Sequence, residues 1–258
     1  MKLQNHVISL STAHDRRQHI KNEFGKQDIS FEFFDAITPD LIGVTCQKLG
    51  INLTQNQRLS NGEKACFLSH VCLWRKMLDE DIKYLAIFED DVYLGENAHL
   101  FLNNDTWVQD IDFDIIKLET WKELVHLGNN GIDVFERQLK ILKSTHVGAA
   151  AYIINQHCAK KAIDYIKSLP NDYIFAIDHV IFGALLKELN TYQLTPALAI
   201  QADRIKPQNL PSQLDSERQK NDFIYQNNDG FFIKIKKIFQ RLHRSIGKRT
   251  FYKIISFQ

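Results

Sequence analysis

The sequence predicts an α/β fold with a mostly parallel central sheet that helices cover on both faces. Three observations lead to this prediction. Short apolar runs of strand character alternate with longer segments that repeat apolar residues at helical spacing. One run, residues 84–88, is continuously apolar, as is typical of a strand buried on both faces. The 258 residues, 44% hydrophobic and 24% charged, suffice for one large domain and argue against a disordered or fibrous protein.

The first half of the chain shows this alternation clearly. Residues 6–10 predict a strand, and after a polar loop a helix extends to about residue 24. Residues 31–35 predict a second strand. Ser60 and Glu63 have the spacing of a capping box, ahead of a helical pattern that extends to about residue 78. Residues 84–88 then form the apolar strand.

The second half continues in the same way. Strands are predicted at residues 113–118, 147–154 and 191–200, and helices at residues 156–168 and 177–190. Pro207 and Pro211 then indicate a surface loop. We therefore expect one domain over residues 1–229, large enough to be a catalytic domain, and a separate tail over residues 230–258.

Charge distinguishes the two parts, although the whole chain carries a net charge of only +1. Residues 230–258 hold eight Lys and Arg and no Asp or Glu, which leaves 24 basic and 31 acidic residues in residues 1–229. In the tail, Phe231, Ile235, Ile238 and Leu242 recur at helical spacing. They predict a basic amphipathic helix that contacts an anionic membrane, or else a helix packed on the main domain. The acidic main domain argues against nucleic-acid binding.

Export and membrane insertion are not indicated. The N-terminal residues lack the pattern of a signal peptide, and no apolar run reaches the roughly 18 residues of a membrane span. Cys46, Cys66, Cys72 and Cys158 show neither paired nor C-x-x-C spacing, so we expect free thiols. Together these observations predict a cytoplasmic protein.

Three consecutive carboxylates, Glu89, Asp90 and Asp91, follow the apolar strand. Open α/β sheets bind ligands at the carboxyl ends of their strands. In extended backbone Glu89 and Asp91 point to one side and Asp90 to the other. A hard divalent cation, Mn²⁺ or Mg²⁺, would offset the repulsion between these charges and leave positions for phosphate oxygens. The alternative is a solvated acidic turn.

Several motifs, in order along the main domain, resemble those of glycosyltransferase family 25, with the bacterial lipooligosaccharide β-galactosyltransferases as the most similar members. The motifs are HVISL at residues 6–10 with Arg16 and Arg17, FFDA at 33–36, GEKACFLSH at 62–70, FEDDV at 88–92, KLET at 117–120, His146 with Gly148, YII at 152–154, and Asp178. A series of separate motifs in the expected order is far more specific than one acidic triplet.

The resemblance implies a GT-A-like fold and a UDP-hexose donor, with UDP-galactose as the first choice. It also implies a divalent metal and transfer with inversion to the lipid-linked glycan of a lipooligosaccharide or lipopolysaccharide. Residues 89–91 would be the counterpart of the family's D-x-D motif, with Glu89 in place of the first Asp. Glu89 and Asp91 would then be metal ligands, while Glu89 and Asp90 would contact the nucleotide sugar.

The matched motifs imply further donor contacts: Ser9, Leu10, Arg16, Arg17, Asp35, Ala36, Glu63, Lys64, His70, His146 and Gly148. A guanidinium after the first strand has paired donors for uracil, ribose or diphosphate, although a solvated helix start explains one of the two arginines equally well. Asp35 is either a nucleoside contact or a turn residue. His70 is either part of the site or a hydrogen-bonded core histidine.

Inverting transfer needs a carboxylate base beside the acceptor hydroxyl. Asp178 is the first choice and Glu119 the second, and either is alternatively a helix cap or an ion-pair partner. Asp203 or His179 is a possible third metal ligand.

Other functions fit parts of the pattern. One is the same fold with UDP-glucose or another UDP-sugar as donor. Another is a metal-dependent phosphotransferase or hydrolase, because such enzymes also use clustered acids at a strand end. The third is a non-catalytic glycan-binding protein. A lipid-linked acceptor would place the enzyme on the inner face of the bacterial inner membrane, as a peripheral protein.

Overall fold

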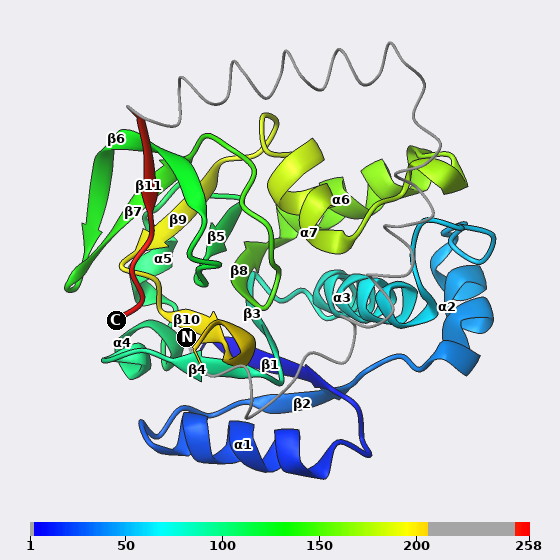
Figure 1. Cartoon of the computed structure of the whole chain (residues 1–258), viewed down its shortest axis with the longest axis horizontal. Helices are drawn as coiled ribbons and strands as arrows, with labels where there is room; N and C mark the ends of the chain where they lie inside the picture. Colours follow the sequence, from blue (N-terminus) through cyan, green and yellow to red (C-terminus); the bar gives the residue numbers. More distant parts are fainter. Residues whose placement is uncertain (1–2, 206–250) are drawn as a thin grey trace.

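A nine-stranded mixed sheet forms the centre of the protein in the computed structural model, which describes residues 3–205 and 251–258 (Figure 1). The strand order is β11-β6-β7-β9-β5-β8-β3-β1-β2, and β10 pairs separately with β4. The strands are β1 (Gln4–Ser9), β2 (Glu32–Asp35), β3 (Tyr84–Glu89), β4 (Val92–Leu94), β5 (Ile115–Lys117), β6 (Leu124–Val134), β7 (Arg137–Leu142), β8 (Ala151–Asn155), β9 (Thr191–Thr195), β10 (Ala199–Gln201) and β11 (Tyr252–Ile254).

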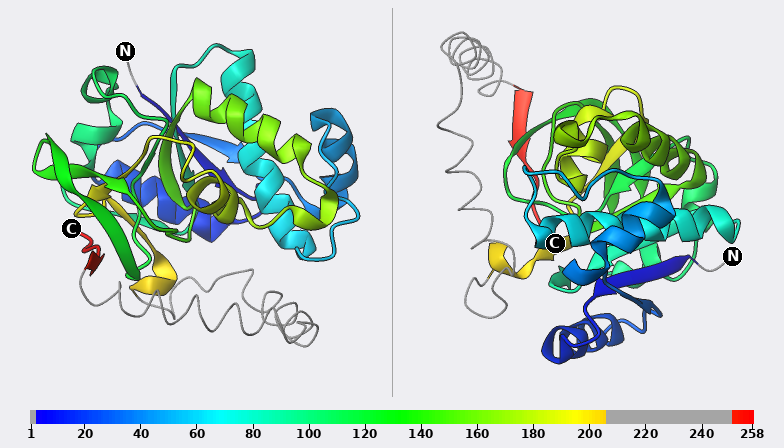
Figure 2. Two further views of the ribbon diagram at one scale, coloured as in Figure 1. Left: turned by 90° about the horizontal axis from the view of Figure 1, so that it is seen from above. Right: turned by 90° about the vertical axis from the view of Figure 1, so that its right-hand side faces the viewer.

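Helices pack on both faces of this sheet, as the sequence predicts (Figure 2). The α-helices are α1 (His14–Gly25), α2 (Ile42–Leu49), α3 (Asn61–Asp79), α4 (Ala98–Leu102), α5 (Thr106–Gln109), α6 (Gln156–Ser168) and α7 (Ile177–His179). The described residues also form three 3-10 turns, η1 (Pro39–Leu41), η2 (Asn171–Tyr173) and η4 (Ala202–Arg204), and a π-helical turn, η3 (Val180–Ala184).

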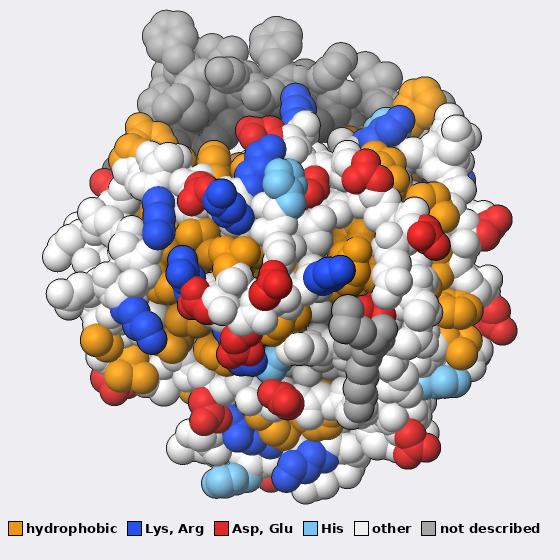
Figure 3. Space-filling model, turned by 180° about the vertical axis from the view of Figure 1, so that it is seen from behind, with side chains coloured by type: hydrophobic (Ala, Val, Ile, Leu, Met, Phe, Trp, Pro, Cys, Tyr) orange, Lys and Arg blue, Asp and Glu red, His pale blue; other side chains and the backbone are white. Residues whose placement is uncertain are grey.

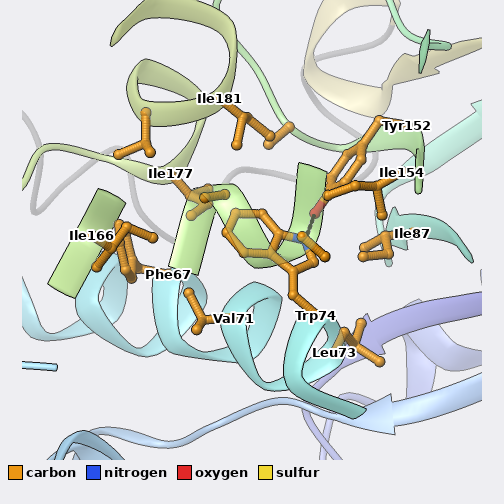
Figure 4. Close-up of a cluster of buried hydrophobic side chains, with 14 of the residues drawn as sticks. Phe67, Val71, Leu73, Trp74, Ile87, Tyr152, Ile154, Ile166, Ile177 and Ile181 are labelled. Atoms are coloured by element: carbon orange, nitrogen blue, oxygen red, sulfur yellow. Dashed lines mark hydrogen bonds between the residues drawn. The ribbon is translucent and has the colours of Figure 1, made fainter. Parts of the chain in front are cut away.

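Alternating side chains of β3 divide the core into two apolar clusters. Leu85 and Ile87 belong to the cluster under α2, α3 and α6, whereas Ala86 and Phe88 belong to the cluster under α1, α4 and α5. This alternation follows from the two-residue period of a strand, and burial of both faces requires the continuous apolar run. In the first cluster Trp74 lies among aliphatic side chains and donates a hydrogen bond to the Tyr152 hydroxyl (Figure 4).

The expected predominance of parallel strands is wrong. Among the described strands of the large sheet, β1 pairs in parallel with β2 and β3, and β5 pairs in parallel with β9, while the other pairings are antiparallel. The reasons are that β8 runs antiparallel between β3 and β5, and that β6 and β7 form a hairpin. Apolar patterning indicates where a strand lies but gives no information on its direction.

Most predicted elements of the first half are confirmed, with small shifts at their ends. α3 begins at Asn61 and carries the full capping box, in which Ser60 and Glu63 bond each other's backbone N–H groups. The strand predicted at residues 191–200 is two strands, β9 and β10, separated around Pro196, which has no backbone N–H for a sheet ladder. The helix predicted at residues 177–190 ends earlier, because α7 and η3 reach only Ala184.

The predicted amphipathic helix at residues 231–242 lies outside the described residues. The end of the predicted tail is described, and there Tyr252–Ile254 form β11, which pairs antiparallel with β6 instead of continuing a helix. Arg137 donates hydrogen bonds to the backbone oxygens of Ala197 and Gln258, which ties this end to the main domain. The division of the chain at residue 229 stays a prediction.

Acidic and basic side chains are interspersed on the face opposite that of Figure 1 (Figure 3). None of the helices in the described part of the chain combines the length and the hydropathy that a bilayer crossing requires.

The capping box of α3 yields a stability prediction. We expect Ser60→Ala to lower the free energy of unfolding by about 1 kcal/mol, because the Glu63 N–H loses its acceptor at the helix N-terminus. Urea denaturation measures this loss. Ser168→Ala is the control, since the exposed Ser168 hydroxyl bonds a backbone oxygen at the other end of a helix, and its effect should stay within about 0.5 kcal/mol. Equal effects of the two substitutions would contradict the role of the cap.

Candidate active site

A cleft of about 480 Å³ opens at the carboxyl ends of β1 and β3. These strands are parallel neighbours, with Ile8 opposite Glu89, so the residues that follow each strand meet at one edge of the sheet. The start of α3, the turns around Gly148 and Asp178, the segment after β2, Trp121 and Gln201 complete the wall. Of the predicted site residues, those that line the cleft are Ser9, Leu10, Arg16, Ala36, Glu63, Glu89, Asp90, Asp91, Gly148 and Asp178.

Asp90 is held by residues on the first strand and helix. The Ser9 hydroxyl donates a hydrogen bond of 2.6 Å to Asp90 Oδ2, and Arg16 Nη1 lies 2.6 Å from Asp90 Oδ1. The same guanidinium nitrogen lies 3.5 Å from Asp91 Oδ2. Arg16 therefore neutralises part of the acidic cluster while its side chain lines the cleft.

Glu89 and Asp91 converge on the amide of Gln201, which sequence reasoning did not identify. Gln201 Nε2 lies 3.4 Å from Glu89 Oε2 and 3.4 Å from Asp91 Oδ1. Its orientation is fixed because Gln201 Oε1 accepts a 3.0 Å hydrogen bond from the Trp121 indole N–H. Pairing of β10 with β4, with Gln201 opposite Val92, brings the amide to this place. The strand-end rule, applied to the strand predicted at residues 191–200, could have identified it, because Gln201 directly follows that strand.

The acidic cluster brings three carboxylates together at one edge of the cleft. Asp91 is buried, and burial, followed by the charge of Glu89, raises its pKa to about 7. Arg16 contacts Asp90 and Asp91. Two convergent carboxylates fit a hard divalent cation such as Mn²⁺ or Mg²⁺, for which Glu89 and Asp91 would supply the oxygen ligands.

Asp178 stands on the other side of the cleft, held by the backbone of Gly148. Its Oδ2 accepts a 2.8 Å hydrogen bond from the Gly148 N–H, and its Oδ1 accepts from the His179 N–H at 2.8 Å. Gly148 has a φ of +92°, and a Cβ there would lie 2.3 Å from Trp121 Nε1. Only glycine fits between Trp121 and the backbone at this position.

Glu119 and Lys117 form a buried pair under the Gly148 turn. Lys117 Nζ lies 3.1 Å from Glu119 Oε1 and also donates to the Gly148 carbonyl, while the Ala150 N–H donates to Glu119 Oε1 at 2.6 Å. Burial raises the pKa of Glu119 and lowers that of Lys117. Neither side chain lines the cleft. Glu119 therefore supports the turn that holds Asp178.

His146 and Lys64 also lie behind the cleft wall. His146 Nδ1 is 2.9 Å from Gln193 Oε1, and His146 Nε2 accepts from the Trp121 backbone N–H at 3.3 Å. Burial, together with the charge of Lys117, lowers the pKa of His146 to about 3, so the ring is neutral. Lys64 is buried, with Nζ 3.4 Å from the Thr54 carbonyl.

Arg17 and Asp35 pair with each other outside the cleft. Arg17 also donates to the backbone oxygens of Ser9 and Leu10 at 3.0 and 3.1 Å, and its guanidinium lies over the Phe33 ring. The pair thus shapes the end of β1. His179 and Asp203, the possible third metal ligands, are not among the residues that line the cleft.

His70 is fully buried beside Glu89 and does not line the cleft. The Tyr152 hydroxyl lies 2.8 Å from His70 Nδ1 and accepts a 3.0 Å hydrogen bond from Trp74. Because the hydroxyl accepts from Trp74, its hydrogen is available for His70 Nδ1, and we assign the ring proton to Nε2. His70 Nε2 lies 3.5 Å from Glu89 Oε1.

A polar cleft at the strand ends of an open α/β sheet is typical of enzymes, which bind their ligands there. The model of the family described as "Glycosyltransferase family 25 (LPS biosynthesis protein)" matches residues 2–181. The chain belongs to this family, as the sequence motifs indicate, and is therefore a glycosyltransferase by family.

Named relatives agree with this assignment. The chain is 39% identical to the "Lipooligosaccharide biosynthesis protein lic2B" of Haemophilus influenzae, over 84% of this chain and 83% of that protein. It is 40% identical to the "Lacto-N-neotetraose biosynthesis glycosyltransferase LgtB" of Neisseria meningitidis, over 77% and 74% of the two chains. A solved glycosyltransferase involved in glycosylation of the major capsid of PBCV-1 aligns over 86% of this chain and 100% of its own, with a TM-score of 0.47 and 5% identity.

The raised pKa of Asp91 gives a pH-dependent stability in the metal-free protein. A carboxyl whose pKa rises from 3.8 to about 7 on folding stabilises the folded state below about pH 4, and this contribution is lost as the pH rises through about 7. We expect a loss on the order of 4 kcal/mol over this range. Urea unfolding in a chelator, at several pH values, measures it.

Asp91→Asn should remove this dependence on pH, because the asparagine amide does not titrate. Asp110→Asn, at an exposed position outside the cleft, should retain it. An equal dependence in all three proteins would show that Asp91 does not titrate in this range.

Proposed function

We propose that the protein transfers a hexose from a UDP-sugar, with UDP-galactose as the first choice, to the glycan of a lipooligosaccharide or lipopolysaccharide, with inversion at the anomeric carbon. The observation that carries the proposal is one cleft with an acidic, cation-compatible cluster on one wall and Asp178 on the other. Membership of family 25 and the names of the relatives support the substrate class. In this proposal the fold is GT-A-like.

The donor's diphosphate lies at the acidic wall. A divalent cation bound by Glu89 and Asp91 would neutralise the charge that develops on the departing UDP. Arg16 lies beside both Asp90 and Asp91 and lines the cleft, so its guanidinium is placed to contact a phosphate oxygen. The Asp90 carboxylate, itself held by the Ser9 hydroxyl, accepts a hydrogen bond from this arginine and holds it in position.

Asp178 takes the proton of the acceptor hydroxyl as the new glycosidic bond forms. Both of its oxygens accept a backbone hydrogen bond, which fixes the carboxylate while it still lines the cleft. Glu119, the second choice from sequence, lies behind the wall and acts through the Gly148 turn. The two carboxylates thus have separate roles in the proposal.

The proposed acceptor is lipid-linked, so we place the enzyme in the cytoplasm, in peripheral contact with the inner face of the bacterial inner membrane. The predicted basic helix would supply the contact with anionic lipid. That helix lies outside the described residues, and the proposal for it rests on the sequence pattern alone.

A donor panel tests the proposal. UDP release is measured with UDP-galactose, UDP-glucose and other UDP-sugars, with Mn²⁺ and with a chelator. We expect one donor to dominate, activity to need the metal, and Asp91→Asn to lower activity by about 100-fold or more, because one cation ligand is lost. Asp110→Asn is the matched control.

Three results would contradict the proposal. Full activity in the chelator would exclude a requirement for a metal ion. Release of inorganic phosphate from a phosphoester would favour a phosphotransferase or hydrolase. Binding of glycan without any release of UDP would favour a non-catalytic glycan-binding protein.

The role of Asp178 has its own prediction. Asp178→Asn should lower kcat by about 100- to 10,000-fold, because the amide cannot take a proton, while the affinity for UDP changes little. Steady-state kinetics and UDP titration by calorimetry measure the two effects. Asp172→Asn, an exposed carboxylate six residues earlier, is the control, and a similar loss in both variants would argue against a base at position 178.

A further inference from the structure

Cys66 and His70 lie one helical turn apart on α3, and both side chains face Glu89 at the end of β3. Cys66 Sγ is 3.9 Å and His70 Nε2 is 3.5 Å from Glu89 Oε1. The sulfur, nitrogen and carboxylate oxygen all lie within 4.8 Å of one another. A four-residue spacing on a helix places two ligands on the same face.

His70 is the part of this group that points to a ligand. Its ring is fully buried, and Nε2 has no hydrogen-bond partner in the described structure although it is directed toward Glu89 and Cys66. A buried polar nitrogen without a partner is costly. On the other side of the ring, Nδ1 is held by the Tyr152 hydroxyl. That hydroxyl accepts a hydrogen bond from Trp74 (Figure 4). Metal-binding histidines are commonly oriented by such a second hydrogen bond.

We propose that Cys66, His70 and Glu89 form a binding site for a thiophilic divalent ion such as Zn²⁺. Sulfur, imidazole and carboxylate are the ligands that zinc prefers, and a water molecule or substrate oxygen would complete a tetrahedral set. Zinc–ligand bonds of about 2.0–2.3 Å place ligand atoms up to about 4 Å apart, so small side-chain movements close the site. The Cys66 thiol releases its proton to solvent when the sulfur binds the ion. The His70 ring proton moves from Nε2 to Nδ1, which then donates to the Tyr152 hydroxyl and leaves the Nε2 lone pair for the ion.

This site is distinct from the proposed position of the hard cation but shares one residue with it. Glu89 Oε1 faces His70 and Cys66, whereas Glu89 Oε2 faces Gln201, whose amide also contacts Asp91. A zinc ion bound by Cys66 and His70 also binds the Glu89 carboxylate, so Glu89 attracts the hard cation less strongly. The consequence is that zinc and the hard cation influence each other's affinity through Glu89.

Cobalt spectroscopy tests the site without any sugar nucleotide, so the outcome is separate from that of the proposed function. Co²⁺ is titrated into the full chain, freed of metal, and thiolate-to-cobalt charge-transfer absorption is recorded in the near ultraviolet. We expect one equivalent of Co²⁺ to produce the band and Zn²⁺ to displace it. Absence of the band in the unmodified protein would overturn the proposal.

Substitutions identify the residues that produce the charge-transfer band. Cys66→Ala should abolish it, Tyr152→Phe should weaken cobalt binding by about 10- to 100-fold, and Asp91→Asn should leave the band in place. Cys72→Ser is the matched control, because Cys72 is a half-buried thiol on the same helix, and it should bind cobalt as the unmodified protein does. A band that persists in Cys66→Ala would refute the site.

A measurement on the unmodified protein covers the case in which a variant fails to fold. Cysteine alkylation, mapped by mass spectrometry, is compared with and without Zn²⁺. Zinc should slow the alkylation of Cys66 and leave that of Cys72 unchanged. Equal rates for Cys66 in both conditions would contradict the proposal.

Discussion

The crowding of three carboxylates at the end of a buried strand is the constraint on which the site depends. Glu89 is the last residue of β3, and Asp90 and Asp91 follow it where the chain leaves the apolar core. Like charges in a partly desolvated place repel one another unless neighbours offset the charge. The surrounding side chains do so in different ways: Arg16 contributes a charge, Ser9 a hydroxyl and Gln201 an amide. The convergence of Glu89 and Asp91 on one point is what makes this wall suitable for a cation.

The opposite wall depends on packing more than on charge. Gly148 has no room for a side chain because Trp121 lies against it, and the Lys117–Glu119 pair holds the same turn from below. Asp178 is fixed by the Gly148 N–H and so stays at a constant place in the cleft. The buried Lys117–Glu119 pair therefore positions the Gly148 turn. Removal of either side chain would leave an uncompensated charge under that turn.

The first half of the fold and one wall of the site were predictable from sequence because their signals are local. The apolar run before Glu89 and the capping box at Ser60 each act within a few residues. Strand direction was not predictable, because β8 has the same apolar pattern whichever way it runs. Gln201 reaches the acidic wall through the pairing of β10 with β4, a contact over more than 100 residues of chain, and there it accepts the Trp121 hydrogen bond. The placement of Lys64, Glu119 and His146 behind the wall also required tertiary structure, since a motif shows which residues are near a site but not which side chains face it.

The distance in sequence between Asp91 and Gln201, 110 residues, has a consequence for the order in which the molecule is built. Parallel pairing of β1 with β2 and β3 involves only the first 89 residues and can form while synthesis continues. The amide that contacts the carboxylates is made much later, and closing so long a loop is slow relative to local folding. A nascent chain therefore carries an exposed anionic strand end during much of its elongation, and the ligand-binding form of the protein arises only when the last strands dock.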